Sequence, residues 1–183
     1  MRVIGGEFRS RRLKTLRGLE TRPTPDRLRE SLFNVLAPRI ADTVFLDAYA
    51  GTGAVGIEAL SRGARRAILV EKNRSAAALI RENLSALGLE SRAEVFVSKA
   101  VPVLERVSAD IIFLDPPYEL ENEYPAALAV LGSSAAGLVI AQHSTRLALK
   151  PDYGCLRRYR ELKQGDNILS FYSSTSVQDR PGL

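Results

Sequence analysis

Two short segments carry the residues whose types and spacing could do chemistry, and each follows an apolar run. In the first, Asp47 precedes Gly51, Gly53 and Gly56. The Gly-x-Gly-x-x-Gly spacing permits a tight turn close to a phosphate, so a nicotinamide dinucleotide is one ligand to consider. Asp47 weighs against it, because a carboxylate just before the turn repels a pyrophosphate and attracts an ammonium group. The segment therefore favours a ligand that joins a nucleoside to an amino acid.

A further acid in a comparable position is Glu71, directly after the apolar run 67–70. An acid at the end of the neighbouring strand can accept both hydrogen bonds of a ribose diol. The alternative is a surface acid beside Lys72. Three glycines within six residues exceed what a plain turn requires, so the glycine segment and Glu71 together favour nucleoside binding.

The second segment is Asp115-Pro116-Pro117-Tyr118. An exocyclic amine on a nucleobase is planar and a poor nucleophile, because its lone pair is delocalised into the ring. The Asp115 carboxylate and the Pro116 carbonyl can accept its two N–H bonds and aim the lone pair at an electrophilic methyl group. The prolines restrict φ along the loop, and Tyr118 offers a ring face to an unstacked base. The alternative is a proline-rich strand exit with a packed tyrosine.

The elements that must position these segments follow a regular alternation from residue 43 onward. Strands are expected over 44–46, 67–70, 93–97, 110–114 and 137–142, and helices over 54–62, 74–87, 100–107 and 121–131. Short apolar strands that alternate with helices indicate a parallel, doubly wound α/β sheet covered on both faces. Asp47, Glu71 and Asp115 would then meet at the carboxyl edge of that sheet.

The two ends of the chain follow other patterns. Segments 3–8 and 11–16 predict a small N-terminal β-hairpin with an Arg-rich tip, and Thr24 with Pro25 predicts the start of a helix that ends before Pro38. Segments 156–163 and 168–172 predict an antiparallel hairpin at the sheet edge, and fraying is expected from Ser173 onward. The expected organisation is a basic extension at 1–39, a main domain at 40–174 and a frayed tail at 175–183.

Composition limits the class of protein. The chain has 183 residues, a hydrophobic fraction of 45% and a net charge of +5, which fit one globular core. No apolar run is long enough to span a bilayer and no signal peptide is evident, so a cytoplasmic protein is expected. One cysteine, Cys155, and one histidine, His143, exclude an intrachain disulfide and leave too few ligands for a zinc site. No metal is expected.

The positive charge is concentrated at the N-terminus. Residues 1–39 carry ten basic and four acidic side chains, a net charge of +6, while the remaining 144 residues sum to −1. Such arms commonly bind polyphosphate, although a solvated surface is the alternative. The residues expected to contact nucleic acid lie at the hairpin tip: Arg9, Arg11, Arg12 and Lys14.

The motifs together resemble a class I S-adenosylmethionine methyltransferase that acts on an exocyclic amine. Within that class, the chain most resembles the bacterial enzymes that methylate guanine N2 in 16S ribosomal RNA of the small subunit. This resemblance covers residues 2–172. The segments that carry it are Ile4-Gly5-Gly6, Thr21-Arg22-Pro23-Thr24, Arg29-Glu30-Ser31-Leu32-Phe33-Asn34, Glu58-Ala59-Leu60-Ser61-Arg62-Gly63-Ala64 and Gly165-Asp166-Asn167.

This resemblance implies S-adenosyl-L-methionine as the cofactor and a role for each matching residue. Residues 115–118 would hold the target guanine, and Arg22 with Thr24 would close over the cofactor. The other residues implied to bind the cofactor are Asp47, Tyr49, Ala50, Gly51, Thr52, Gly53, Glu71, Lys72, Ser98, Lys99 and Ala100. The implied partner is 16S ribosomal RNA or a small-subunit assembly particle, bound by a monomer.

The chain departs from the family pattern at two places. Ser98-Lys99-Ala100 replaces the acid often found near the adenine amine, so backbone groups are expected to read adenine. Gln142 stands after the fifth strand, where a glutamate is expected. His143 is expected to be a hydrogen-bonded histidine rather than a general base.

Three other interpretations fit parts of the sequence. An adenine-N6 methyltransferase would use the same Asp-Pro-Pro-Tyr loop, but no second domain is present to read a DNA duplex. An NAD-dependent oxidoreductase rests on the glycine motif alone. A non-catalytic RNA-binding protein leaves Asp115 and the prolines unexplained.

Overall fold

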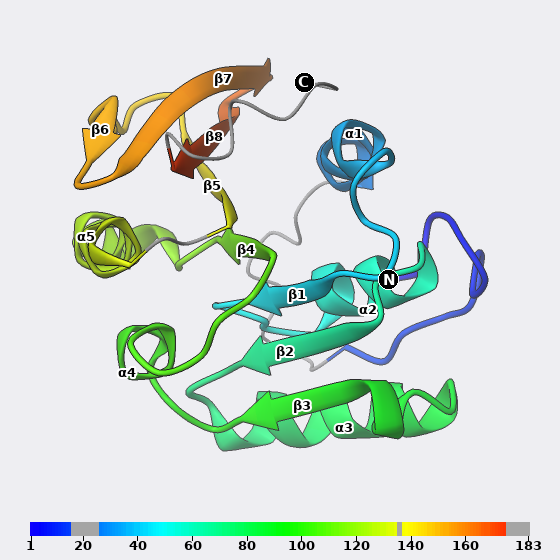
Figure 1. Ribbon diagram of the computed structural model, residues 1–183. Coiled ribbons are helices and arrows are strands. Elements are labelled where there is room, and N and C mark those ends of the chain that lie inside the picture. The colour runs from blue at the N-terminus through cyan, green and yellow to red at the C-terminus, as the bar shows by residue number, and fades with distance from the viewer. Residues whose placement is uncertain (16–25, 135–136, 175–183) are drawn as a thin grey trace.

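An eight-stranded sheet organises the computed structural model, which describes residues 1–15, 26–134 and 137–174 (Figure 1). The strands are β1 Val44–Asp47, β2 Arg66–Val70, β3 Ala93–Phe96, β4 Ile111–Leu114, β5 Leu138–Ser144, β6 Asp152–Tyr153, β7 Leu156–Gln164 and β8 Asn167–Ser174. The helices are α1 Asp26–Leu36, α2 Ala54–Ser61, α3 Arg74–Ala86, α4 Ala100–Leu104 and α5 Glu123–Ser133, with 3-10 turns η1 Glu90–Arg92 and η2 Tyr118–Leu120. None of these helices is long and apolar enough to cross a membrane.

The strand order is β3-β2-β1-β4-β5-β8-β7-β6, and the first five strands of that row are parallel. β8 joins β5 in the antiparallel direction, and β7 and β6 extend the edge. The order reverses between β1 and β4, which is the position where open α/β sheets bind ligands. The predicted doubly wound sheet with an antiparallel edge hairpin is therefore confirmed.

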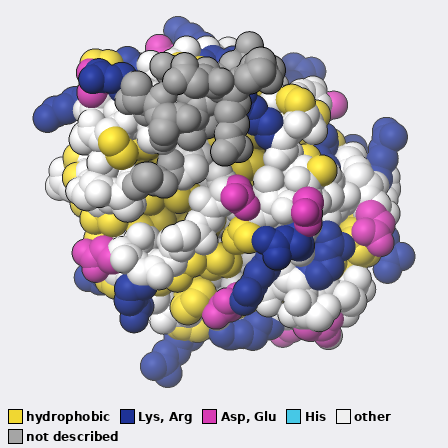
Figure 2. Space-filling model, in the orientation of Figure 1, with side chains coloured by type: hydrophobic (Ala, Val, Ile, Leu, Met, Phe, Trp, Pro, Cys, Tyr) yellow, Lys and Arg dark blue, Asp and Glu magenta, His cyan; other side chains and the backbone are white. Residues whose placement is uncertain are grey.

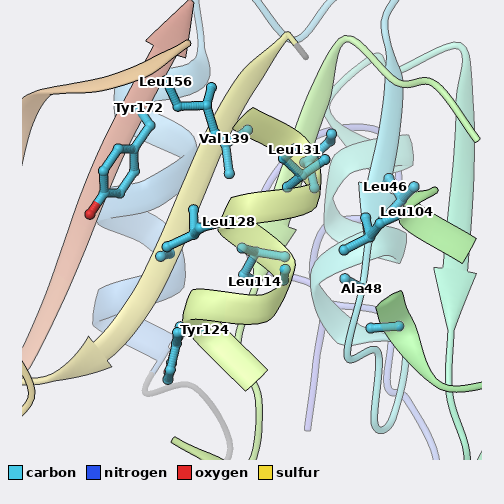
Figure 3. Close-up of a cluster of buried hydrophobic side chains, with 14 of the residues drawn as sticks. Leu46, Ala48, Leu104, Leu114, Tyr124, Leu128, Leu131, Val139, Leu156 and Tyr172 are labelled. Atoms are coloured by element: carbon cyan, nitrogen blue, oxygen red, sulfur yellow. The ribbon is translucent and has the colours of Figure 1, made fainter. Parts of the chain in front are cut away.

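Helices cover both faces of the sheet. α4 and α5 pack on one face, where side chains such as Leu104, Leu128 and Leu131 contact Leu46, Leu114 and Val139 of the strands (Figure 3). On the other face α1 and α2 pack over β1, β4, β5 and β8, and α3 packs beside α2. The strands are apolar on both sides because both sides are covered, which explains their lack of polar alternation.

The predicted N-terminal hairpin is present but shorter than expected. Residues 1–3 and 11–13 run antiparallel: a bridge joins Arg2 and Arg12, the Val3 N–H donates to the Arg11 carbonyl at 3.0 Å, and the Leu13 N–H donates to the Met1 carbonyl at 3.0 Å. Residues 5–10 form bends and turns. The cause is a contact with α2: the carboxylate of Glu58 accepts hydrogen bonds from the N–H groups of Ile4 and Gly5, both at 2.8 Å. Those donors are no longer available to a strand ladder.

Several element boundaries also differ from the prediction. α4 ends at Leu104 rather than near 107, and residues 105–106 form a turn. β8 continues through Ser173 and Ser174, which are buried, so fraying from Ser173 was wrong for these two residues. The short strand β6 was not predicted. Leu16, Thr24, Pro25 and the tail 175–183 lie outside the described residues.

Candidate active site

Asp47 is a buried carboxylate at the carboxyl end of β1. Its side chain is 1% exposed, and Oδ2 accepts a hydrogen bond from the Gly56 N–H at 3.2 Å. Burial, with the nearby charge of Asp115, raises the pKa of Asp47 to about 7. A buried carboxylate whose charged form is disfavoured in this way is suited to a cationic partner, such as the ammonium group of an amino acid.

The glycine turn that follows Asp47 leaves open space at Gly51. Gly51 and Gly53 adopt positive φ angles of 54° and 79°, which favour glycine, and the Gly53 N–H bonds to the Ala50 carbonyl at 2.7 Å. A Cβ on Gly51 would meet no atom within 4 Å, whereas one on Gly56 would lie 2.8 Å from Leu69 Cδ2. Gly51 therefore faces free space for a ligand, and Gly56 allows α2 to pack on β2.

Glu71 links the end of β2 to two neighbouring segments. Its Oε2 accepts the Gly51 N–H at 2.9 Å, and its Oε1 accepts the Asn73 N–H at 2.7 Å. Asn73 in turn caps α3 through Oδ1, which accepts the N–H groups of Ser75 and Ala76. Glu71 is therefore a structural support of the glycine turn and not an isolated surface acid, and each oxygen keeps acceptor capacity for a ligand.

Three other residues of the turn point to different neighbours. The Tyr49 hydroxyl donates to Glu123 Oε2 on α5 at 3.0 Å, and burial together with that carboxylate raises the pKa of Tyr49. Ala50 is buried, and the Thr52 hydroxyl lies 3.7 Å from Met1 Sδ. The side chains of Tyr49 and Thr52 thus make structural contacts away from the turn. The contact with Glu123 was missed because it joins residues 74 apart.

The Asp-Pro-Pro-Tyr loop follows β4 on the strand adjacent to β1. Asp115 is partly buried, and its charge acts on Asp47. Pro116 is buried and Pro117 is exposed, with φ of −52° at Pro117 just before η2. The side chain of Tyr118 lies outside the described part of the structure, so its stacking role stays a prediction. The structure therefore brings the two predicted acids together at one sheet edge.

Residues 98–100 lie beside Glu71 at the next strand. The Ser98 N–H donates to the Glu71 carbonyl at 3.2 Å, Lys99 is exposed and precedes α4, and Ala100 is buried as its first residue. Lys72 is exposed and lines a depression of about 430 Å³ with Arg74, Arg81 and Val97. The adenine contacts expected of these residues stay a prediction.

The N-terminal arm, residues 1–15, is held on the domain by several contacts, and two of them involve buried polar residues that sequence reasoning missed. Glu58, fully buried on α2, binds the arm backbone and also accepts from Arg62 Nε at 2.7 Å. Asn83, buried on α3, accepts the Lys14 N–H at 2.8 Å and donates to the carbonyls of Lys14 and Thr52 at 3.2 and 3.3 Å. The sequence did contain a signal for these contacts, because Glu58 and Asn83 stand within otherwise apolar helix patterns.

The arm presents its basic side chains to solvent. Arg9, Arg11, Arg12 and Lys14 are exposed, and Lys14 Nζ pairs with Glu82 at 2.9 Å. A depression of about 690 Å³ lies between the arm and α1, lined by Met1, Arg2, Ser10, Arg12 and Asp26. Figure 2 shows Lys and Arg side chains distributed over one face of the molecule, with acidic side chains among them. Arg22 and Thr24 lie outside the described residues.

The strand order and the residues at the sheet edge together define a class I methyltransferase fold. The defining residues are an acid before a glycine turn, an acid after β2 and an Asp-Pro-Pro-Tyr loop after β4. Comparison with solved structures agrees with this fold class. The structure matches the Escherichia coli protein yhhF, provisionally described as a methyltransferase, with a TM-score of 0.83 and 31% sequence identity. The match covers 95% of this chain and 97% of the Escherichia coli chain. Hypothetical protein TTHA0928 of Thermus thermophilus matches with a TM-score of 0.79 and 33% identity over 94% and 99%.

Residues 1–173 match the family described as Conserved hypothetical protein 95, and the chain belongs to that family. The chain is 34% identical to Bacillus subtilis YlbH, whose name assigns it provisionally to the rRNA methyltransferases, over 94% of this chain and 98% of that protein. It is 43% identical to Ribosomal RNA small subunit methyltransferase D of Escherichia coli over 64% of this chain. That alignment spans 60% of the Escherichia coli protein.

Proposed function

We propose that this protein is an S-adenosylmethionine-dependent methyltransferase that methylates the exocyclic N2 amine of a guanine in 16S ribosomal RNA. The observation that carries the proposal is the pair Asp47 and Asp115 on adjacent strands, one suited to an ammonium group and one to an amine. Relatives named as rRNA methyltransferases support the substrate class.

The residues at the sheet edge fit S-adenosylmethionine. The buried Asp47 carboxylate, whose Oδ2 accepts the Gly56 N–H, would bind the ammonium group of the methionine end. Glu71 would accept from the ribose diol, and Gly51 leaves the space in which the nucleoside would lie. When bound, S-adenosylmethionine supplies an electrophilic methyl group on its sulfonium.

The Asp-Pro-Pro-Tyr loop would prepare the amine. Asp115 and the Pro116 carbonyl accept the two N–H bonds of N2, which draws the nitrogen toward tetrahedral geometry and directs its lone pair at the methyl carbon. In the transfer, the C–N bond would form as the sulfur–carbon bond breaks, and the Asp115 carboxylate would stabilise the positive charge that grows on nitrogen. The nitrogen then loses one proton to Asp115 or to water, so no separate base is required.

The arm would hold the RNA. Its exposed Arg9, Arg11 and Arg12 can neutralise phosphates, and the contacts of Glu58 and Asn83 fix the arm relative to the glycine turn. An RNA bound by the arm would therefore be positioned relative to the cofactor site rather than tethered loosely to it.

Mass mapping of 16S rRNA nucleosides from cells with and without the gene tests the proposal. We expect one N2-methylguanosine to disappear with the gene. Loss of an N6-methyladenosine instead would favour the adenine enzyme that shares the Asp-Pro-Pro-Tyr loop. Calorimetric titration with S-adenosylmethionine and with NAD separates the methyltransferase from an oxidoreductase.

A further inference from the structure

Gln142, in the carboxyl-terminal half of β5, holds a buried acceptor for which the described residues provide no hydrogen-bond partner. The residue is 4% exposed, yet no group within the described residues bonds to its Oε1. Buried side-chain polar atoms are bonded in the large majority of cases, so this exception calls for an explanation. The fold holds this residue in place from its backbone, since the Tyr124 hydroxyl donates to the Gln142 carbonyl.

The side chain of Gln142 projects from the same face of the sheet as the site. Along β5, Val139 and Ala141 pack with α4 and α5, whereas Leu138 and Ile140 pack with α1 and α2. Side chains of a strand alternate between faces, so Gln142 faces the α1 and α2 side.

Asp47 and Asp115 belong to that same face. Phe45 in β1 and Phe113 in β4 both pack with α1 and α2, and the two acids lie two residues after them. The bond from Gly56 on α2 to Asp47 agrees with this direction. Three polar side chains therefore lie on one face of three adjacent strands, β1, β4 and β5, in the order Asp47, Asp115, Gln142.

The register places Gln142 one strand beyond Asp115. Leu114 pairs with Ala141, so the next positions along β4 and β5 are 115 and 142. Neighbouring strands lie about 4.8 Å apart. Along one edge of guanine the N2 amine, the N1–H donor and the O6 acceptor follow in sequence over a similar length, so a base whose N2 lies at Asp115 extends toward Gln142.

We propose that Gln142 is a specificity-determining residue that reads the Watson–Crick edge of the target guanine. Its Oε1 accepts the N1–H and its amide nitrogen donates to O6, which gives the orphaned acceptor its partner. The inference rests on the proposed guanine-N2 activity. The proposed contact comes from β5, whereas the glycine turn follows β1 and the Asp-Pro-Pro-Tyr loop follows β4.

The test varies the protein and the base together. A synthetic RNA hairpin carries, at the nucleotide that the wild-type protein methylates, either guanine or 2-aminopurine, which keeps the amine but lacks the N1–H and O6. The variant Gln142→Met removes the amide at similar volume, and Gln142→Leu is a second variant in case the first fails to fold. The readout is kcat/KM for each protein on each RNA.

We expect the wild-type protein to prefer guanine over 2-aminopurine by about ten- to a hundredfold, as for a bidentate base contact. The variants should lose that preference through slower guanine methylation, with 2-aminopurine methylation changed less than about threefold and cofactor affinity unchanged. An equal decrease on both bases would show that Gln142 only supports packing and would overturn the inference. No methylation of guanine RNA by the wild-type protein would overturn the proposed function itself.

Discussion

Asp47 is buried beside Asp115, and its burial together with the charge of Asp115 raises the pKa of Asp47 to about 7. Near neutral pH the free protein is therefore a mixture of forms with and without a proton on Asp47. A ligand ammonium favours the charged carboxylate, so cofactor binding must release this proton wherever it is present.

This linkage predicts the pH dependence of cofactor binding. The affinity for S-adenosylmethionine should rise from about pH 5.5 to about 7 by about tenfold per unit, because the acid form of Asp47 must ionise first, and should level off above the pKa. Calorimetry in two buffers of different ionisation enthalpy measures both the affinity and the proton released. Asp47→Asn should bind more weakly, by roughly 1.5 to 3 kcal/mol, and without this slope. A slope that persists in the variant would assign the titration to another group.

Glu71 provides a second prediction for the cofactor site. Glu71→Gln keeps one acceptor for the two N–H groups of Gly51 and Asn73 and turns a donor toward one of them. We expect S-adenosylmethionine affinity to fall about tenfold or more, since both the turn and the ribose contact are affected. The matched control is Glu94→Gln, an exposed partner of Arg66 on β3, which should bind normally. Equal S-adenosylmethionine affinities in the two variants would show that Glu71 does not contribute to cofactor binding.

The buried contacts of Glu58 predict that its loss lowers the stability of the protein more than the loss of an exposed acid that pairs with the arm. Glu58→Ala leaves Arg29 and Arg62 without their buried carboxylate and should lower the free energy of unfolding by about 3 to 5 kcal/mol. Glu82→Ala removes the exposed pair with Lys14 and should cost about 0 to 1 kcal/mol. Urea unfolding of both variants measures the difference. Similar small losses would mean that Glu58 does not anchor the arm.

The elements that could be predicted from the sequence are those set by local pattern. Apolar runs that end at Asp47, Glu71 and Asp115 placed all three acids at one sheet edge, and the structure agrees. The short pairing within the arm could not be predicted in the same way, because Glu58, 54 residues away, binds the N–H group of Ile4 where the pairing stops. The unpaired amide oxygen of Gln142 was likewise invisible, since a missing partner among the described residues is a property of packing and not of spacing.

RNA binding by the arm predicts a change in salt dependence. Replacing Arg9, Arg11 and Arg12 with Gln removes three exposed charges and should reduce the slope of log affinity against log salt by up to about 3, while cofactor binding stays intact. The control removes three exposed charges elsewhere, at Arg106, Arg146 and Lys150. If both triple variants reduce the slope equally, the effect is one of net charge and the arm has no special role.

Methyl transfer by Asp115→Asn tests the central claim most directly. The variant keeps the shape and one acceptor oxygen but removes the charge that matters as positive charge grows on nitrogen. In single-turnover reactions with labelled S-adenosylmethionine and 16S rRNA, followed by nucleoside mass analysis, the wild-type protein should form N2-methylguanosine. Asp115→Asn should form it about a hundredfold more slowly or worse, with cofactor affinity little changed. A near-normal rate for the variant, or a wild-type product other than N2-methylguanosine, would contradict the account.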